Sequence, residues 1–306
     1  MAESHAHHHL RTMVGKKLTL AIILNILISV SQTIAGFMAG SLALLSDALH
    51  NISDVIALCV SYVANRLSGR KSTLTETYGY HRAEIIAAFI NAGMLLGVAV
   101  LLVKEALERL FHPLVVDSEL VIIFAALGLC FNGLSAALLR KEAAGNINVR
   151  SAFLHLFADM MTSLFVFMGG LLIRVWEVYW VDSVLCIVVA FYLVLSSWRV
   201  LVETMRVIMH FTPESIDLRD IEQEVLHHSG VENIHHVHVW QMNDRDIHFE
   251  AHVDFKEDLS LSKVSETIDK INDDLRQKFG INHSILQPEI GVADSKQFVV
   301  TDCPHV

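Results

Sequence analysis

Long apolar segments alternate with short polar loops over the first two thirds of the chain. A helix of about 20 apolar residues crosses the hydrocarbon core of a bilayer, which is about 30 Å thick. Six segments approach or exceed this length: Leu18–Ala39, Ser41–Leu67, Ile85–Phe111, Glu119–Leu139, Ser151–Ile173 and Ser183–Glu203. The pattern predicts an α-helical membrane protein with six transmembrane helices over residues 18–209, after an N-terminal tail over residues 1–17.

From residue 210 onward the long apolar segments end, and shorter segments with a regular alternation of apolar and polar residues follow. Ser215–His228 reads as an amphipathic helix closed by Gly230, and Leu261–Phe279 again has helical spacing. The segments NIHHVHVWQM and DIHFEAHVDF alternate with period two, and INHSILQPE makes a third strand. We therefore expect a C-terminal cytoplasmic α+β domain of the ferredoxin-like (αββαβ) kind over residues 210–290, followed by a tail over residues 291–306.

The alternation also predicts a strand register. If the apolar positions of the first two strands share one face, the hairpin needs a loop with an odd number of residues, such as 244–246. That register places His238 opposite His252, and His236 opposite Asp254.

Charge separates the two regions. The chain is 53% hydrophobic and 18% charged, with a formal net charge of −10, whereas average soluble domains are about 25% charged. Residues 210–306 hold 8 Lys and Arg against 19 Asp and Glu, and residues 1–209 hold 15 against 14. A lipid bilayer is therefore the expected partner of the first region, and an acidic second region argues against nucleic acid.

The basic residues of the short loops predict the orientation, because cytoplasmic loops are enriched in Lys and Arg. Twelve of them fall on the side of the N-terminus, and three, Lys104, Arg109 and Arg174, fall on the other side. We expect both termini in the cytoplasm, in a membrane that is most simply the bacterial inner membrane.

Ionisable residues lie deep inside two of the predicted spans. An ionised side chain at the centre of a bilayer costs about 2.5–3.5 kcal/mol on insertion scales, so each one needs a partner. His50 and Asp54 are four residues apart in the second span, and His155 and Asp159 are four apart in the fifth, so each pair shares one helix face. Two neutral imidazoles and two carboxylates would neutralise a divalent cation, and tetrahedral N/O coordination suits zinc.

A single buried Asp–His pair is as easily a hydrogen bond between helices as a metal site. Two copies of one spacing, with no Lys or Arg beside them in the spans, favour a cation site. Asp47 lies on the same face as His50 and Asp54. It is either a carboxylate on the exit path or beside the ligands, or a cap for the second helix, which starts only a few residues earlier.

These motifs resemble the cation diffusion facilitator family, and especially its zinc-transporting members. The resemblance rests on SLALLSDALHNISD, YGYHRAE and FLHLFADMMTS, with HxxxD on both the second and fifth spans, and it extends to HHVHVW and NHSILQPE. It implies a homodimer that exchanges cytoplasmic Zn²⁺ for external H⁺. It also implies that His50, Asp54, His155 and Asp159 form the transport site. Unlike vesicular members, this chain has no histidine in the loop RKEAAGNINVR between spans four and five.

Further candidate ligands lie in the cytoplasmic regions. The resemblance implies His235, His252 and His283, with Glu289 near them, as a peripheral zinc site, although strand alternation turns His235 toward the apolar side. The strand pattern adds His238. The alternative is that these are surface histidines at a dimer contact.

Three weaker candidates remain, each with a simpler alternative. His81 in YGYHRAE is either a loop ligand or part of a solvated helix start. The cluster His5, His7, His8 and His9 either gathers metal or is a flexible tail or cloning remnant, and Cys303 and His305 are either late ligands or a loose tail.

The sequence does not favour an enzyme, because a membrane metalloenzyme needs a base beside its metal and no HExxH motif occurs. A passive divalent-cation channel, or a metal sensor without proton coupling, is the alternative to an antiporter. Both would tolerate the same ligands.

Overall fold

A computed structural model describes residues 23–140, 147–243, 245–293 and 295–299. The chain divides into two compact units, and each is described here by itself. The first unit comprises residues 1–62 and 90–201, and the second comprises residues 63–89 and 202–306.

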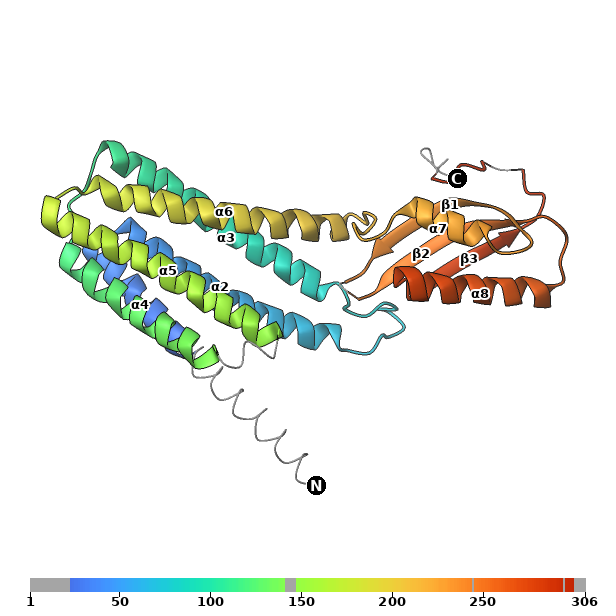
Figure 1. The fold of residues 1–306 in the computed structure, drawn as a ribbon, viewed down its shortest axis with the longest axis horizontal. Coiled ribbons are helices and arrows are strands. Elements are labelled where there is room, and N and C mark those ends of the chain that lie inside the picture. Colours follow the sequence, from blue (N-terminus) through green and yellow to red (C-terminus); the bar gives the residue numbers. More distant parts are fainter. Residues whose placement is uncertain (1–22, 141–146, 244, 294, 300–306) are drawn as a thin grey trace, which may run out of the picture. The chain divides into compact units, whose positions relative to one another are not determined.

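The apolar segments form helices. They are Ile23–Ala39, α2 (Leu42–Ser68), α3 (Ala83–Phe111), α4 (Ser118–Leu139), α5 (Ile147–Trp176) and α6 (Trp180–Ile208) (Figure 1). Five of them, α2 to α6, are long and apolar enough to cross a membrane, and Ile23–Ala39 is shorter. The predicted first span begins at Leu18, and its residues 18–22 lie outside the described part of the chain. The chain is thus a multi-pass membrane protein, and the count of six spans stays a prediction.

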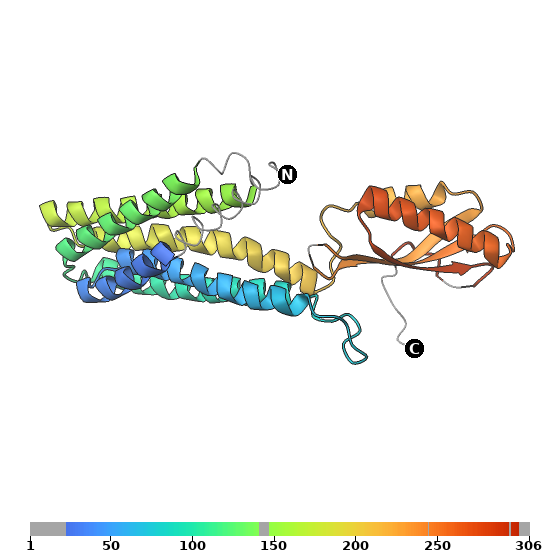
Figure 2. The ribbon, with the colours of Figure 1, turned by 90° about the horizontal axis from the view of Figure 1, so that it is seen from below.

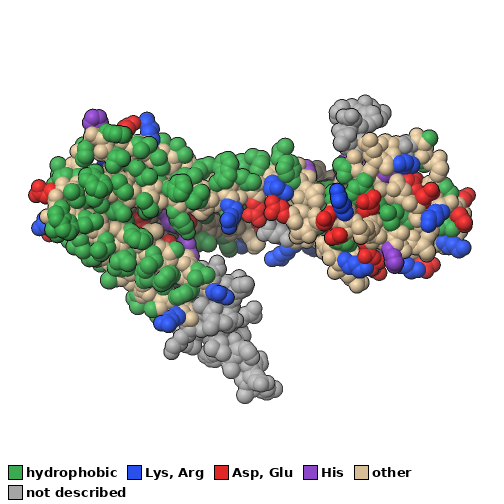
Figure 3. All heavy atoms as spheres, turned by 45° about the horizontal axis from the view of Figure 1, so that its top comes forward, with side chains coloured by type: hydrophobic (Ala, Val, Ile, Leu, Met, Phe, Trp, Pro, Cys, Tyr) green, Lys and Arg blue, Asp and Glu red, His purple; other side chains and the backbone are tan. Residues whose placement is uncertain are grey.

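Apolar side chains cover the outer surface of the helices in the view of Figure 3. Small residues line the contacts between helices: Ala35, Ala43 and Ala125 lie in one buried cluster with Leu44 and Val166. A second cluster joins α2, α3 and α6 through Leu42, Ala106, Cys186 and Ala190. Small side chains let helix backbones approach closely, which favours association where lipid removes the usual hydrophobic driving force.

The start of α2 is held by a residue of another helix. The carboxylate of Asp182 in α6 accepts hydrogen bonds from the backbone N–H of Leu42 at 2.6 Å and of Ala43 at 3.3 Å, and from the Ser41 hydroxyl. Asp182 is 2% exposed. The first N–H groups of a helix have no partner within the helix, so Asp182 provides the N-terminal cap of α2 from a distance in sequence.

The predicted order of elements in the C-terminal domain is confirmed. It contains α7 (Leu218–Leu226), β1 (Val231–Gln241), β2 (Ile247–Phe255), α8 (Leu261–Phe279) and β3 (His283–Glu289). The sheet order is β1-β2-β3, with β1 and β2 antiparallel and β2 and β3 parallel. Both helices cover one face of the sheet (Figure 2), around a core that includes Ile221, Phe249 and Leu275. The ferredoxin-like description itself stays a prediction.

The predicted register of β1 and β2 is wrong. His235, not His238, lies opposite His252, and His238 lies opposite Glu250. The turn comes one residue earlier than predicted, with the Met242 N–H donating to the Asp246 carbonyl, and this places His238 opposite Glu250. A β-bulge between His235 and His238, where His236 adopts a positive φ of 54°, then shifts the pairing further and places His235 opposite His252. One extra residue in β1 shifts the side-chain alternation by one position, so His236 does not face Asp254.

Candidate metal sites

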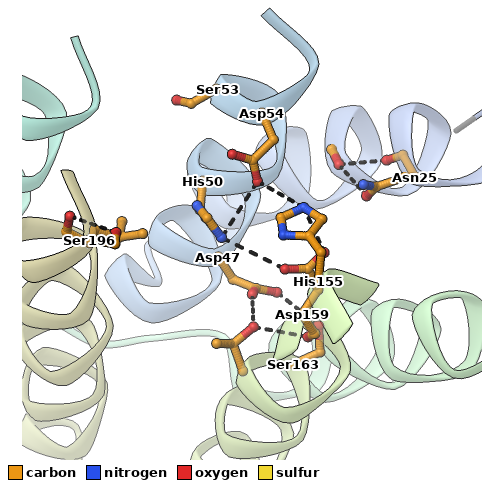
Figure 4. Close-up of polar contacts among 12 residues, drawn as sticks. Asn25, Asp47, His50, Ser53, Asp54, His155, Asp159, Ser163 and Ser196 are labelled. Carbon is orange, nitrogen blue, oxygen red and sulfur yellow. Dashed lines mark hydrogen bonds and ion pairs between the residues drawn. The ribbon is translucent and has the colours of Figure 1, made fainter. Parts of the chain in front are cut away.

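The two HxxxD motifs meet between α2 and α5 (Figure 4). His50 Nε2 lies 3.5 Å from Asp54 Oδ2 and 3.7 Å from Asp159 Oδ1. His155 Nε2 lies 3.3 Å from Asp54 Oδ2 and 3.5 Å from Asp159 Oδ2. Each histidine therefore contacts its own i+4 aspartate and the aspartate of the other helix, a crossed pattern that antiparallel helices produce.

Nitrogen and oxygen atoms thus alternate around a ring with edges of 3.3–3.7 Å. Neighbouring ligands of a tetrahedral zinc ion are about 3.4 Å apart, given bonds of about 2.0–2.1 Å. Among the described residues, groups of three or more ligand atoms all within 4.8 Å of one another occur at two places, both in the C-terminal domain. The intramembrane ring therefore has the edges of a tetrahedron but is more open across its diagonals.

Several atoms of this ring have unused capacity. Asp54 Oδ2 and Asp159 Oδ2 are buried, and their contacts among the described residues are the long ones, of 3.3–3.5 Å, to the imidazoles of the ring. The second nitrogen of His50, Nδ1, is buried with no hydrogen-bond partner in the described part of the chain. Leaving buried polar groups in this state is costly, more so for charged groups. The donor set and its unsatisfied atoms fit a divalent cation.

Exposure falls through the site from one end to the other. The side chains of His155 and Asp54 are 44% and 25% exposed, whereas those of His50 and Asp159 are 12% and 1% exposed. The exposed pair includes the residue nearest the N-terminal end of α5, so the site is reached from that end of the helix.

Asp47 lies one turn beyond the ring, at its closed end. Its carboxylate accepts hydrogen bonds from Thr162 at 2.7 Å, from Ser163 at 3.0 Å and from Gln32 at 3.4 Å. It is 1% exposed and lies within α2, which begins at Leu42. The helix-cap interpretation of Asp47 is therefore wrong, since Asp182 has that role.

Sequence reasoning missed these three partners of Asp47. Thr162 and Ser163 follow Asp159 by three and four residues and so share its face, and Gln32 is a polar residue inside an apolar segment. The helical spacing of Thr162 and Ser163 and the polarity of Gln32 could therefore have been noticed in the sequence. The close packing around Gln32 could not: a Cβ on Gly128 would lie 2.4 Å from the Gln32 amide nitrogen, so glycine is needed there for Gln32 to reach Asp47.

A second cluster lies on the C-terminal sheet. His252 Nδ1 is 2.8 Å from Glu289 Oε1, and His235 Nε2 is 3.6 Å from Glu289 Oε2. Ligand atoms of His235, His252 and Glu289 all lie within 4.8 Å of one another. His235 is fully buried, and the bulge at His236 turns its ring toward these partners. We call His235, His252 and Glu289 the cytoplasmic trio.

Two other predicted ligands of this domain lie elsewhere. The ring of His283 packs against that of His248 in a tilted arrangement, with ring centroids 4.5 Å apart. His238 lines a hollow of about 390 Å³ with His210, Trp240 and Glu250. The structure therefore does not bring His283 or His238 together with the cytoplasmic trio.

His81 forms a contact between the loop before α3 and the β1–β2 hairpin. Its Nδ1 lies 2.8 Å from Asp246 Oδ2, and Asn243 and Asn282 also donate to this carboxylate. Partial burial opposes ionisation of Asp246, but these hydrogen bonds outweigh it and lower its pKa. His81 thus has a structural partner. The N-terminal histidines, Cys303 and His305 lie outside the described residues.

Comparison with known proteins defines the class. The features to be compared are multiple apolar helices, a His–Asp ring between two of them, and a small α+β domain. The cation efflux transmembrane domain matches residues 18–209, and the cytoplasmic domain of cation efflux proteins matches residues 213–290. The chain belongs to the cation efflux family, and the predicted membership in the cation diffusion facilitators is confirmed.

Similar proteins cover nearly the whole chain. The metal cation efflux system protein CzcD of Cupriavidus metallidurans is 30% identical over 95% of this chain and 91% of its own. A protein of Bacillus subtilis named cadmium, cobalt and zinc/H(+)-K(+) antiporter is 32% identical over 92% and 91%. The zinc transporter ZitB of Yersinia pestis is 33% identical over 90% and 88%.

Proposed function

We propose that this protein exports divalent metal cations from the cytoplasm, with zinc as the principal substrate and protons as the counter-ion. The single observation that carries the proposal is the ring of His50, Asp54, His155 and Asp159. Two relatives whose names include zinc transport support the choice of metal.

To bind zinc, the two histidine nitrogens of the ring must approach each other, and so must the two aspartate oxygens. The edges of the ring already have tetrahedral lengths, so a small relative rotation of α2 and α5 brings opposite ligands together without stretching neighbouring pairs. Two carboxylates then neutralise the dication, which removes most of the cost of holding it in a poorly hydrated site. The same rotation, reversed, releases the ion.

The exposure gradient supports loading from the cytoplasm. With the N-terminus in the cytoplasm, α5 begins on the cytoplasmic side, and so His155 and Asp54 face that compartment. Release to the outside requires opening at the Asp47 end. Because Asp47 is held by three hydrogen bonds, we assign it a positioning role beside the ligands.

Proton exchange follows from competition for the same atoms. Zinc needs neutral imidazoles and ionised carboxylates, so protons must leave when it binds. An imidazole titrates near physiological pH, so protons entering from a more acidic outside expel the metal and return through the site. A passive channel or a sensor would use the same ligands without this coupling.

The protein functions as a homodimer in this proposal. The match to the cytoplasmic domain of cation efflux proteins supports dimerisation through the C-terminal domain. The cytoplasmic trio then senses the metal level on the side from which the metal is removed.

The test is zinc flux into proteoliposomes under an imposed pH gradient. An antiporter moves zinc at a rate that follows the size and sign of the gradient, and collapsing it with an ionophore stops accumulation. Asp159→Asn leaves a bound dication with one unmatched charge. This costs about 2.5–3.5 kcal/mol, so flux should fall about 100-fold.

Asp117→Asn is the matched control. Asp117 caps α4 outside the site, and asparagine is an equally good cap, so its flux should equal that of the parent. Flux that ignores the pH gradient would identify a channel. Normal flux in Asp159→Asn would reject the His–Asp ring as the transport site.

A further inference from the structure

A lysine of the C-terminal segment reaches into the cytoplasmic trio. Lys296 Nζ lies 2.8 Å from Asp254 Oδ1, 3.5 Å from Glu289 Oε2 and 3.5 Å from His235 Nε2. Asp254 in turn lies 3.2 Å from His235 Nδ1. One ammonium group therefore contacts two carboxylates and one imidazole of the same cluster.

The segment that carries Lys296 is docked on the sheet. The backbone N–H groups of His236 and Val237 donate to the carbonyl oxygens of Gln297 and Phe298, at 3.2 and 2.9 Å. These two donors lie at the bulge of β1, and Phe298 packs against the core of the domain. The bulge thus has two consequences: it turns His235 toward the cluster, and it binds the segment that delivers Lys296.

A metal ion and the lysine cannot share this cluster. A zinc ion held by the trio would lie about 2 Å from His235 Nε2 and from a Glu289 oxygen, which are two of the atoms that Lys296 approaches. Two cations at this separation repel strongly in a buried site. With the Lys296 ammonium in place, the carboxylates of Asp254 and Glu289 together with the lysine keep a net charge of −1. A bound dication in its place would neutralise both carboxylates.

We propose that Lys296 is a built-in competitor for the divalent cation at the cytoplasmic trio. Metal binding expels its ammonium group, and the segment 296–298 then loses the attachment to the sheet that Lys296 provides. Because the lysine competes, a higher metal concentration is needed to occupy the cytoplasmic trio. Metal binding at the trio then releases the segment 296–298 from the sheet. The inference rests on the proposed role of the trio in metal sensing.

The first experiment measures the zinc affinity of the full-length protein in detergent, by competition with a chromophoric chelator. All variants carry Asp159→Asn, which disables the transport site. Removing the competitor with Lys296→Met should tighten zinc binding about 10- to 100-fold, the worth of one hydrogen bond to a charged group.

Lys270→Met is the matched control. It removes the same charge from the same domain, but Lys270 pairs only with Glu266 on α8 among the described contacts. Its zinc affinity should stay within about twofold of the parent. Adding His252→Asn to Lys296→Met should abolish the gain in affinity.

The second experiment follows the amides of His236 and Val237 by hydrogen–deuterium exchange. Zinc should speed their exchange in the parent and leave it unchanged in His252→Asn. Equal affinity of the Lys296→Met and Lys270→Met variants, or amides that stay protected at saturating zinc, would overturn the inference. Zinc flux into proteoliposomes, measured on the protein with Asp159 intact, distinguishes the proposed transport function from the proposed role of Lys296. If flux is normal and proton-coupled but either of these two results is found, only the role of Lys296 is rejected.

Discussion

Burial of ionisable residues made the candidate transport site visible in the sequence. His50, Asp54, His155 and Asp159 stand out because apolar residues surround them, and their i, i+4 spacing predicts a shared face on each helix. The structure brings the four together. Asp182 was missed because it lies at the end of its apolar segment, where a charged residue usually needs no partner.

His248 provides a test at this scale, because it is buried outside the membrane. It is 6% exposed, stacks on Trp240 and packs against the tilted ring of His283. Burial lowers its pKa, and the charges of His283, His81 and Arg82 add to this against the opposing effect of Asp246. The unfolded chain therefore binds a proton at a higher pH than the folded chain does. Stability from neutral His248 is complete above the ordinary imidazole pKa and is lost as pH falls below it.

We expect the melting temperature of the C-terminal domain to fall between about pH 7.5 and 5.5, and to fall less in His248→Gln. Differential scanning fluorimetry of the full-length protein measures this. His238→Gln, at an exposed position of the neighbouring strand β1, should keep the slope of the parent. Equal slopes in His248→Gln and the parent would contradict the assignment.

At the scale of elements, periodicity predicted helices better than strand register. The helix Leu261–Phe279 has the same bounds in sequence and structure. The β1–β2 register failed because the turn comes one residue earlier than predicted and because a bulge in β1 adds a further shift. His236 adopts a positive φ although it is not a glycine, so no local residue type announced the extra residue.

The cap of α2 by Asp182 gives the prediction at this scale. Asp182→Ala leaves the N–H groups of Leu42 and Ala43 without their acceptor in a buried place, which should cost about 1–3 kcal/mol of stability. Thermal unfolding in detergent should show a lower melting temperature. Asp117→Ala removes the exposed cap of α4 and should cost no more than about 1 kcal/mol. Equal losses of stability in Asp182→Ala and Asp117→Ala would mean that the cap from α6 contributes no more than an ordinary exposed cap.

At the scale of the whole molecule, charge is distributed unevenly along the sequence. The membrane region is close to neutral, and residues 210–306 carry 8 Lys and Arg against 19 Asp and Glu. The ring of His50, Asp54, His155 and Asp159 lies within the first unit, and the cytoplasmic trio lies within the second. Composition placed the boundary near residue 210, whereas the second compact unit also includes residues 63–89. Composition also gave no sign that Lys296 enters the trio, because its contact with Asp254, 42 residues away in the sequence, depends on how the segment folds back.

The acidic domain gives the last prediction, which concerns the dimer. Two copies with a net charge of −11 each repel, and salt screens this repulsion: the Debye length falls from about 10 Å at 0.1 M to about 3 Å at 1 M. We therefore expect added salt alone to bring the two C-terminal domains of the proposed dimer closer together.

Zinc should also bring them closer at low salt, because each dication bound at a cytoplasmic trio removes negative charge. Spin labels at position 270, in a variant without the four native cysteines, would report the distance between protomers by pulsed electron spin resonance. A His252→Asn variant should respond to salt but not to zinc. A distance that responds to neither would show that charge repulsion does not control the dimer, and a zinc response that survives His252→Asn would place the responsible metal outside the trio.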